Sequence, residues 1–197
     1  AFKQNNPSRS AQILAQVPLG VLKPAAQVFA STLSAELAMA RNQPKAALTA
    51  LNHPSLQSLK ELPPEQQIRT GTVHARAYEA DGQTLAAARE CVAMAPLLSG
   101  DAFNSNHEAI GALIAALPAE QLQPSGNPTL DGWISLALAV KNAGTLEQQQ
   151  TAIENWRAQN PGHPAATQLP EPLTKLKVLA SQPLNKIALL LPQDGPL

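Results

Sequence analysis

Few side chains in this sequence have the types and spacings that metal binding requires. His53 and His163 each precede a proline, His74 falls on an expected helix, and His107 adjoins Glu108 near an expected helix start. A metal site would show a histidine pair at i and i+4 or a cluster of cysteines. The sequence has neither pattern, so we expect ordinary surface or capping histidines and no metal site.

The residues that serve as nucleophiles or acid–base pairs are equally sparse. Cys91 is the only cysteine and lies inside an expected helix, where a thiol usually packs as a small apolar group. Serine-nucleophile motifs and the glycine-rich phosphate loop are absent. Glu61 with Glu65, and Glu79 with Asp81, are expected on exposed helix ends, where paired carboxylates are usually solvated. We therefore predict no catalytic residue, no bound cofactor and no enzymatic activity.

Composition excludes further classes of function. Fourteen basic residues balance fourteen acidic ones without a basic run, and aromatic residues make up only 3% of the chain. Nucleic-acid binding needs basic patches or aromatic stacking platforms, so it is not expected. An apolar run of roughly 18 residues, the length that spans a bilayer, is also absent. We expect the chain to be a piece of a longer protein whose export or anchoring signal lies outside it.

The elements that would carry these residues are helices. Eighteen prolines fall mostly between segments with helical apolar spacing, such as Ile110, Leu113, Ile114 and Leu117, and proline at such places starts or stops helices. Almost no segment alternates apolar and polar residues, as a strand would. The sequence predicts an all-α fold with helices at about 8–16, 24–41, 44–51, 64–80, 84–95, 103–117, 129–142, 146–159 and 171–180.

The two tryptophans are expected to anchor the core. Trp133 has helical spacing with Leu136, and Trp156 has helical spacing with Ile153. Large aromatic side chains at such positions usually pack between adjacent helices.

An internal repeat indicates how the helices pair. Residues 38–48 resemble residues 77–88 at a displacement of roughly 40, and both read as helix, short polar turn and helix. Ala47 and Ala87, five positions after the turn residue, would let the second helix pack closely on the first, as in tetratricopeptide hairpins. Stacked hairpins form a curved array with a concave binding face. From Phe103 onward the small-residue pattern is lost, so we expect an irregular solenoid.

The one expected strand lies near the end of the chain. Residues 186–191 form a short apolar run that Pro192 ends, as in a strand of a parallel sheet covered on both faces. We therefore predict a helical repeat domain at 1–182, and at 183–197 a linker with the first strand of a following domain. With the rest of its sheet absent, this strand is expected to be disordered, packed on the helices or paired with another copy.

The C-terminal third resembles the LpoA (YraM, LppC) outer-membrane lipoproteins, a family that activates a class A penicillin-binding protein. The resemblance rests on four blocks: Leu130-Asp131-Gly132-Trp133, Ile153-Glu154-Asn155-Trp156-Arg157, Asn160-Pro161-Gly162-His163-Pro164-Ala165-Ala166 and Asn185-Lys186-Ile187-Ala188-Leu189-Leu190-Leu191-Pro192. Gly111 stands where family members tend to carry a tryptophan, which is typical of a distant branch.

This resemblance implies a tetratricopeptide-like N-terminal domain followed by a domain built like a periplasmic substrate-binding protein. The family engages its synthase through that following domain, so this chain would be the scaffold half, a stiff helical arm in the periplasm, in a protein held to the outer membrane by an N-terminal lipid. Other envelope proteins are possible partners, and no binding residues are assigned.

Two alternatives stay open at this point. The chain is the helical part of a periplasmic solute receptor, whose following lobes would bind a small amino acid or peptide. Alternatively, it is a general peptide-binding repeat module without a role in the cell wall. Binding of a small ligand to a longer protein would favour the first, because a ligand that binds only the folded state raises its stability.

Overall fold

The computed structural model describes residues 7–180, which form helices and connecting loops without a strand. These residues belong to two compact units, Ala1–Leu138 (unit 1) and Ala139–Leu197 (unit 2). The α-helices are α1 (Pro7–Ala15), α2 (Pro24–Met39), α3 (Pro44–Leu51), α4 (Pro64–Ala80), α5 (Thr84–Met94), α6 (Gly100–Ala116), α7 (Pro128–Lys141), α8 (Leu146–Gln159), α9 (Pro164–Thr167) and α10 (Glu171–Ala180). Short 3-10 helices are η1 (Leu19–Val21), η2 (Pro54–Glu61), η3 (Ala95–Leu97) and η4 (Ala119–Gln121).

The all-α prediction is confirmed, and most helix bounds lie within two residues of the expected ones. The expected strand at 186–191 lies outside the described residues. No helix in residues 7–180 combines the length and apolar character needed to cross a membrane.

Prolines start many of these helices. Pro24, Pro44 and Pro64 occupy the first turns of α2, α3 and α4. Proline suits this position because its fixed φ matches the helix, and its missing N–H would have had no helical partner there. The prolines therefore set where α2, α3 and α4 begin.

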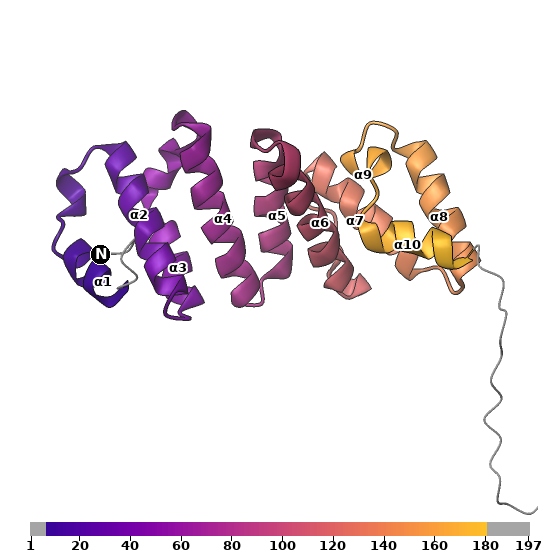
Figure 1. The fold of residues 1–197 in the computed structure, drawn as a ribbon, viewed down its shortest axis with the longest axis horizontal. Coiled ribbons are helices and arrows are strands. Elements are labelled where there is room, and N and C mark those ends of the chain that lie inside the picture. The colour runs from indigo at the N-terminus through magenta and orange to yellow at the C-terminus, as the bar shows by residue number, and fades with distance from the viewer. Residues whose placement is uncertain (1–6, 181–197) are drawn as a thin grey trace, which may run out of the picture. The chain divides into compact units, whose positions relative to one another are not determined.

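Successive helices of unit 1 pack on their neighbours in chain order. Figure 1 shows α2, α3, α4, α5 and α6 side by side, and the backbone contacts pair α2 with α3, α3 with α4, α4 with α5, and α5 with α6. Ala47 on α3 and Ala87 on α5 have no exposed surface, which confirms their predicted packing role. The small side chains let each second helix approach its partner closely.

The first hairpin and α4 share an apolar core rich in alanine. The core residues are Ala35, Ala38, Ala47, Leu51, Val73 and Ala77, from three helices. Next to it lies a small polar cluster, in which the Thr32 and Thr70 hydroxyl oxygens are 2.8 Å apart. Gln66 Nε2 donates to both hydroxyls, at 3.3 and 3.2 Å. These bonds satisfy the buried hydroxyls and link α2 to α4.

Trp133 on α7 is buried in unit 1, where it is 2% exposed. Trp156 on α8 is 5% exposed in unit 2, where α8 contacts both α9 and α10. The Arg157 Nε–H donates to the Ala166 carbonyl at 2.9 Å, which fastens α8 to α9. Both tryptophans are core anchors, as predicted.

Candidate functional site

The candidate site is a groove on unit 1 that α4, α5 and α6 line together. Its volume is about 560 Å³. It is lined by Ile68, Thr72, Ala75, Arg76, Glu79, Thr84, Cys91, Met94, Leu98, Ala102, Ser105, Asn106, Ala109, Ala112, Leu113 and Ala116. A groove of this size accommodates a short segment of polypeptide or a small molecule.

The wall on α6 owes its shape to small residues. Ala102, Ala109, Ala112 and Ala116 are spaced by seven, three and four positions, which places them on one face of the helix. Their methyl groups leave room that larger side chains would fill. The opposite wall is α4, where Ile68 and Ala75 share a face at the same seven-residue spacing.

The floor of the groove is α5, which packs against both α4 and α6. Met94 lies at the end of α5, where the Thr72 hydroxyl donates to its sulfur at 3.8 Å. Asn106 Nδ2 donates to the Cys91 carbonyl at 2.9 Å and so ties α6 to this floor. These contacts fix the positions of the three helices at the groove.

The groove is chiefly apolar and carries no net charge. Ten of its sixteen lining residues are Ala, Ile, Leu, Met or Cys, and its only charged side chains are Arg76 and Glu79 on α4. Such a lining favours an uncharged, apolar segment of polypeptide. It does not bring together the titratable groups that acid–base catalysis needs.

Cys91 is the one thiol among the groove-lining residues, and it is buried at 6% exposure. Burial raises the pKa of this thiol to about 11, and the carboxylates of Glu79 and Glu90 add to the increase. The thiol is therefore protonated at neutral pH. Since the thiolate is the reactive form, Cys91 serves as a packing residue, as the sequence predicts.

Two histidines cap helices, in agreement with prediction. His53 Nδ1 accepts a hydrogen bond from the Ser55 backbone N–H at 3.2 Å, at the start of η2. His163 Nδ1 accepts from the Ala165 N–H at 3.1 Å, at the start of α9. Each proline after the histidine opens the helix that the imidazole caps.

The other two histidines, His74 and His107, pack against neighbouring side chains. The His74 ring on α4 stacks on Tyr78 with the ring centres 4.4 Å apart, and its Nδ1 lies 3.4 Å from Glu90 Oε1 on α5. His107 is only 2% exposed, so the expectation of a surface or capping role is wrong for it. His107 lies within α6, and its burial comes from the next helix, because its ring meets the Trp133 ring of α7 edge-on at 4.9 Å.

The two carboxylate pairs, which the sequence predicts to be solvated, do not form a site. Glu61, Glu65 and Glu79 are exposed, and only Glu79 borders the groove. Within residues 7–180, the structure holds no group of three His, Cys, Asp or Glu side chains placed to hold a metal ion.

Sequence reasoning did not find the groove. The expected concave face was general, and no binding residue could be assigned to it. The one available signal was the spacing of the four alanines on α6, which reads equally well as plain helix propensity. The groove exists because α4 and α6 are separated by α5, and this three-dimensional relation leaves no motif in the sequence.

The whole chain, residues 1–197, matches a family model described as LppC putative lipoprotein. A curated relative from Dickeya chrysanthemi, named penicillin-binding protein activator LpoA, is 34% identical over 83% of this chain and 25% of the relative. A relative of the same name from Vibrio cholerae is 30% identical over 99% of this chain and 33% of the relative. The chain thus spans between a quarter and a third of the length of these relatives.

Solved structures share the fold. Full-length LpoA from Haemophilus influenzae superposes with a TM-score of 0.70 at 24% identity, covering 89% of this chain and 32% of that one. The N-terminal domain of the same protein gives a TM-score of 0.67 at 24% identity over 89% of this chain and 80% of the domain. The likeness to an isolated domain is consistent with the tetratricopeptide-like description.

Proposed function

Because the chain belongs to the LppC lipoprotein family, we propose that it is the N-terminal scaffold and interaction domain of an outer-membrane lipoprotein that activates a class A penicillin-binding protein. The observation that carries this proposal is the family match over the whole chain, supported by the activator name of the relatives. The activation belongs to the longer protein, in which this chain is one part.

This helical part would contribute as a stiff arm that keeps its shape. The alanine-rich packing of α2, α3 and α4 holds the hairpins in fixed register, so the stack keeps its shape where a flexible linker would not. We place the helical domain at 1–182 and the start of a substrate-binding-protein-like domain at 183–197. That following domain would contact the synthase. The helical domain would act without catalysis, in the periplasm, with the outer membrane reached through an N-terminal lipid.

The test uses the full-length lipoprotein and the class A synthases of the same bacterium. We expect the protein to capture a synthase in a pull-down with purified components and to raise its rate of peptidoglycan synthesis. A matched version that lacks residues 1–182 should still bind in solution, because the contact lies in the following domain. Failure of the full-length protein to bind or stimulate any class A synthase would contradict the proposal.

The groove favours a second candidate function, which is binding of a peptide segment. Its occupant would be an uncharged, apolar stretch of polypeptide, since the lining is mostly apolar and the charges of Arg76 and Glu79 offset each other. Ala112 lines the groove and is exposed, so Ala112→Arg would obstruct it. Ala93 is exposed on α5 and lies outside the lining, so Ala93→Arg is the matched control.

Fluorescence anisotropy with a panel of labelled decapeptides of graded apolar content measures this binding. If the groove binds peptides, affinity rises with apolar content, and Ala112→Arg lowers it at least ten-fold while Ala93→Arg leaves it unchanged. Equal effects of the two substitutions, or no binding across the panel, would reject the peptide-binding candidate and leave the scaffold role untouched.

A further inference from the structure

The α4 wall of the groove has a counterpart on α2, which the internal repeat identifies. The repeat displaces residues by forty positions, since Ala47 of α3 and Ala87 of α5 are equivalent and both are fully buried. The same displacement relates each groove-lining residue of α4 to one residue of α2. The pairs are Val28 with Ile68, Thr32 with Thr72, Ala35 with Ala75, Glu36 with Arg76, and Met39 with Glu79. We call the five α2 residues the covered face and the five α4 residues the open face.

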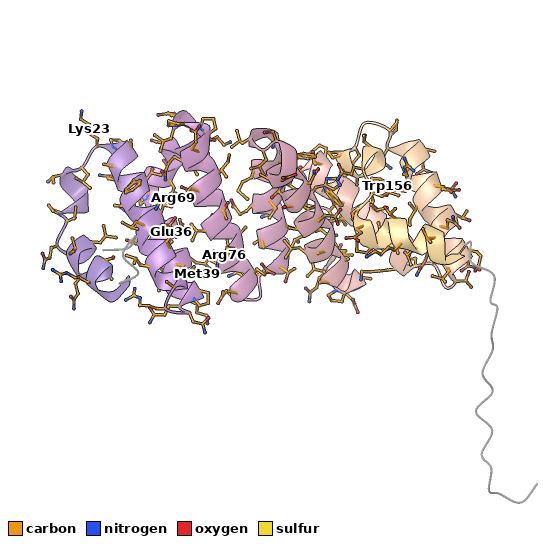
Figure 2. The ribbon with its side chains drawn as sticks, viewed as in Figure 1. Lys23, Glu36, Met39, Arg69, Arg76 and Trp156 are labelled. Atoms are coloured by element: carbon orange, nitrogen blue, oxygen red, sulfur yellow. The ribbon has the colours of Figure 1, made fainter. Side chains whose placement is uncertain are left out.

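The covered face of α2 packs against α4. Thr32 has no exposed surface, and its hydroxyl oxygen lies 2.8 Å from that of Thr70. At the edge of the face, the Arg69 Nε and Nη2 groups donate to the two carboxylate oxygens of Glu36, each at 2.6 Å. Figure 2 shows Glu36 and Arg69 together between α2 and α4, with Arg76 further along α4. A neighbouring helix thus covers this face through a hydroxyl contact and an ion pair.

The open face of α4 borders the groove instead of a helix. Thr72 and Arg76 are exposed, whereas their counterparts Thr32 and Glu36 are buried and half-buried. The next helix, α6, packs on α5, and the groove lies between α6 and the open face. Arg76 forms no ion pair with a carboxylate of residues 7–180. The stack therefore leaves uncovered on α4 the face that it covers on α2.

We propose that the open face binds an amphipathic α-helix of a partner protein, which packs on α4 as α4 packs on α2 and places a carboxylate against Arg76. The covered face favours a helix over an extended segment, because the same residue pattern packs against a helix there. Arg76 carries the opposite charge to Glu36, so the partner has an acidic residue where α4 has Arg69. This inference rests on the peptide-binding candidate above and specifies its occupant: the apolar stretch is one face of a helix, and the carboxylate lies at the edge of that face.

The test uses the 197-residue chain and a peptide with the sequence of α4, because α4 is the helix that covers the equivalent face. The acidic peptide comprises residues 64–80 with Arg69→Glu, which supplies the carboxylate, and Gly71→Ala, which raises helix propensity. The basic peptide carries Gly71→Ala alone and keeps Arg69. Fluorescence anisotropy should show the acidic peptide binding about five- to ten-fold more tightly, because it presents an opposite charge to Arg76 and the basic peptide presents a like charge.

Charge reversal on the chain tests the assigned contact. In Arg76→Glu the preference should invert, so that the basic peptide binds more tightly than the acidic one. Arg89→Glu is the matched control, since Arg89 is exposed on α5 and lies outside the groove lining. It changes the net charge equally and should leave the preference of the unaltered chain in place. Because Arg76 and Arg89 are both exposed, both variants should fold, and circular dichroism checks this.

A third peptide tests the helical form of the occupant. It adds Ala75→Pro to the acidic peptide, and proline in the middle of a helix disrupts it. Ala75 belongs to the open face of α4 and not to the side of α4 that packs on α2, so the contacting side of the peptide keeps its residues. Binding should weaken at least ten-fold.

Four results would overturn the proposal. Equal binding of the acidic peptide with and without Ala75→Pro would show that the groove takes an extended segment, and the peptide-binding candidate would survive without the helix. A preference that Arg76→Glu does not invert would reject the carboxylate contact. No binding of either helical peptide would reject the helical occupant, and the decapeptide panel would then decide separately on the peptide-binding candidate. Self-association of the unaltered chain that Ala112→Arg abolishes would assign the groove to a second copy.

Discussion

Asn42 and Gly82 occupy equivalent positions in two helical turns forty residues apart, and both have left-handed backbone conformations, with φ of 56° and 78°. The residue after each donates its N–H to a carbonyl five positions back: Gln43 to Ala38 at 2.9 Å and Gln83 to Tyr78 at 2.8 Å. These bonds satisfy carbonyls at the ends of α2 and α4. The repeat seen in the sequence is thus a repeat of turn geometry.

Gly82→Ala is expected to destabilise unit 1 by about 1 to 2 kcal/mol, because a Cβ is disfavoured at positive φ. An added Cβ at Gly82 would meet no atom within 4 Å, so the cost is one of backbone conformation alone. Gly20→Ala is the control, since its Cβ is equally unobstructed and its φ is not positive. Urea unfolding measures both. Equal stabilities of the two variants would show that the turn tolerates a side chain.

Gly71 on α4 is constrained by packing instead of backbone conformation. A Cβ added there would lie 2.5 Å from the sulfur of Met94 and 2.7 Å from its Cγ. Met94 is itself 7% exposed, so it has little room to move. This close contact brings the end of α5 against the middle of α4.

Gly71→Ala is therefore expected to lower the free energy of unfolding by about 1 kcal/mol, as overpacking outweighs the gain in helix propensity. In a Met94→Ala background the same change should raise stability by about 0.5 to 1 kcal/mol, because only the propensity gain remains. Denaturant unfolding of the two single variants and the double variant tests this reversal. The same sign in both backgrounds would contradict the packing account.

The helices could be predicted because two local signals coincide. Proline at the first position of α2, α3 and α4 marks their starts, and the apolar spacing marks their lengths. The 3-10 helices were missed, since η1, η3 and η4 have only three residues each and η2, with eight, does not follow the 3.6-residue spacing of an α-helix. The burial of His107 was not predicted, because it depends on contact with Trp133 of α7, which the apolar spacing of α6 alone does not indicate.

Contacts between helices could not be read in the same way. Arg69 and Glu36 are thirty-three residues apart and meet because α2 and α4 lie side by side. The groove likewise depends on the distance between α4 and α6. Which residues of two neighbouring helices meet depends on how the helices are offset along their axes. The sequence repeat predicts this for Ala47 and Ala87 but not for the longer side chains.

Cys91 makes the stability of unit 1 depend on alkaline pH. Its pKa is raised from an ordinary value of 9.0 to about 11, so the folded state holds this proton more tightly than the unfolded state. The resulting stabilisation is fully present below pH 9 and is lost as the pH rises toward 11. The loss is expected to be roughly 1 to 3 kcal/mol.

Urea unfolding at pH 8 and pH 10.5 measures this loss in the unaltered chain and in Cys91→Ala. Burial also raises the pKa of Tyr78, but that residue is present in both proteins, so the difference between them isolates the thiol. Cys91→Ala should be less stable at pH 8 and should lose less stability on going to pH 10.5. Parallel pH dependence in the two proteins would show that the thiol is not desolvated.

Trp156 joins two helices of unit 2, so its removal should have both a global and a local effect. The indole is 5% exposed and meets the His163 ring edge-on at 5.1 Å, while His163 caps α9. Trp156→Ala is expected to lower the free energy of unfolding by about 3 to 5 kcal/mol, and Trp156→Phe by less, because an aromatic ring is kept.

The local effect should appear in α9. Because its cap residue His163 is no longer packed in Trp156→Ala, α9 should open more often than α10. Hydrogen exchange by mass spectrometry should therefore show faster exchange at residues 164–168 in Trp156→Ala, whereas Thr151→Ala, at an exposed position of α8, should leave that segment protected. Uniform acceleration over 146–180 in Trp156→Ala would mean that the indole supports unit 2 as a whole and not α9 through His163.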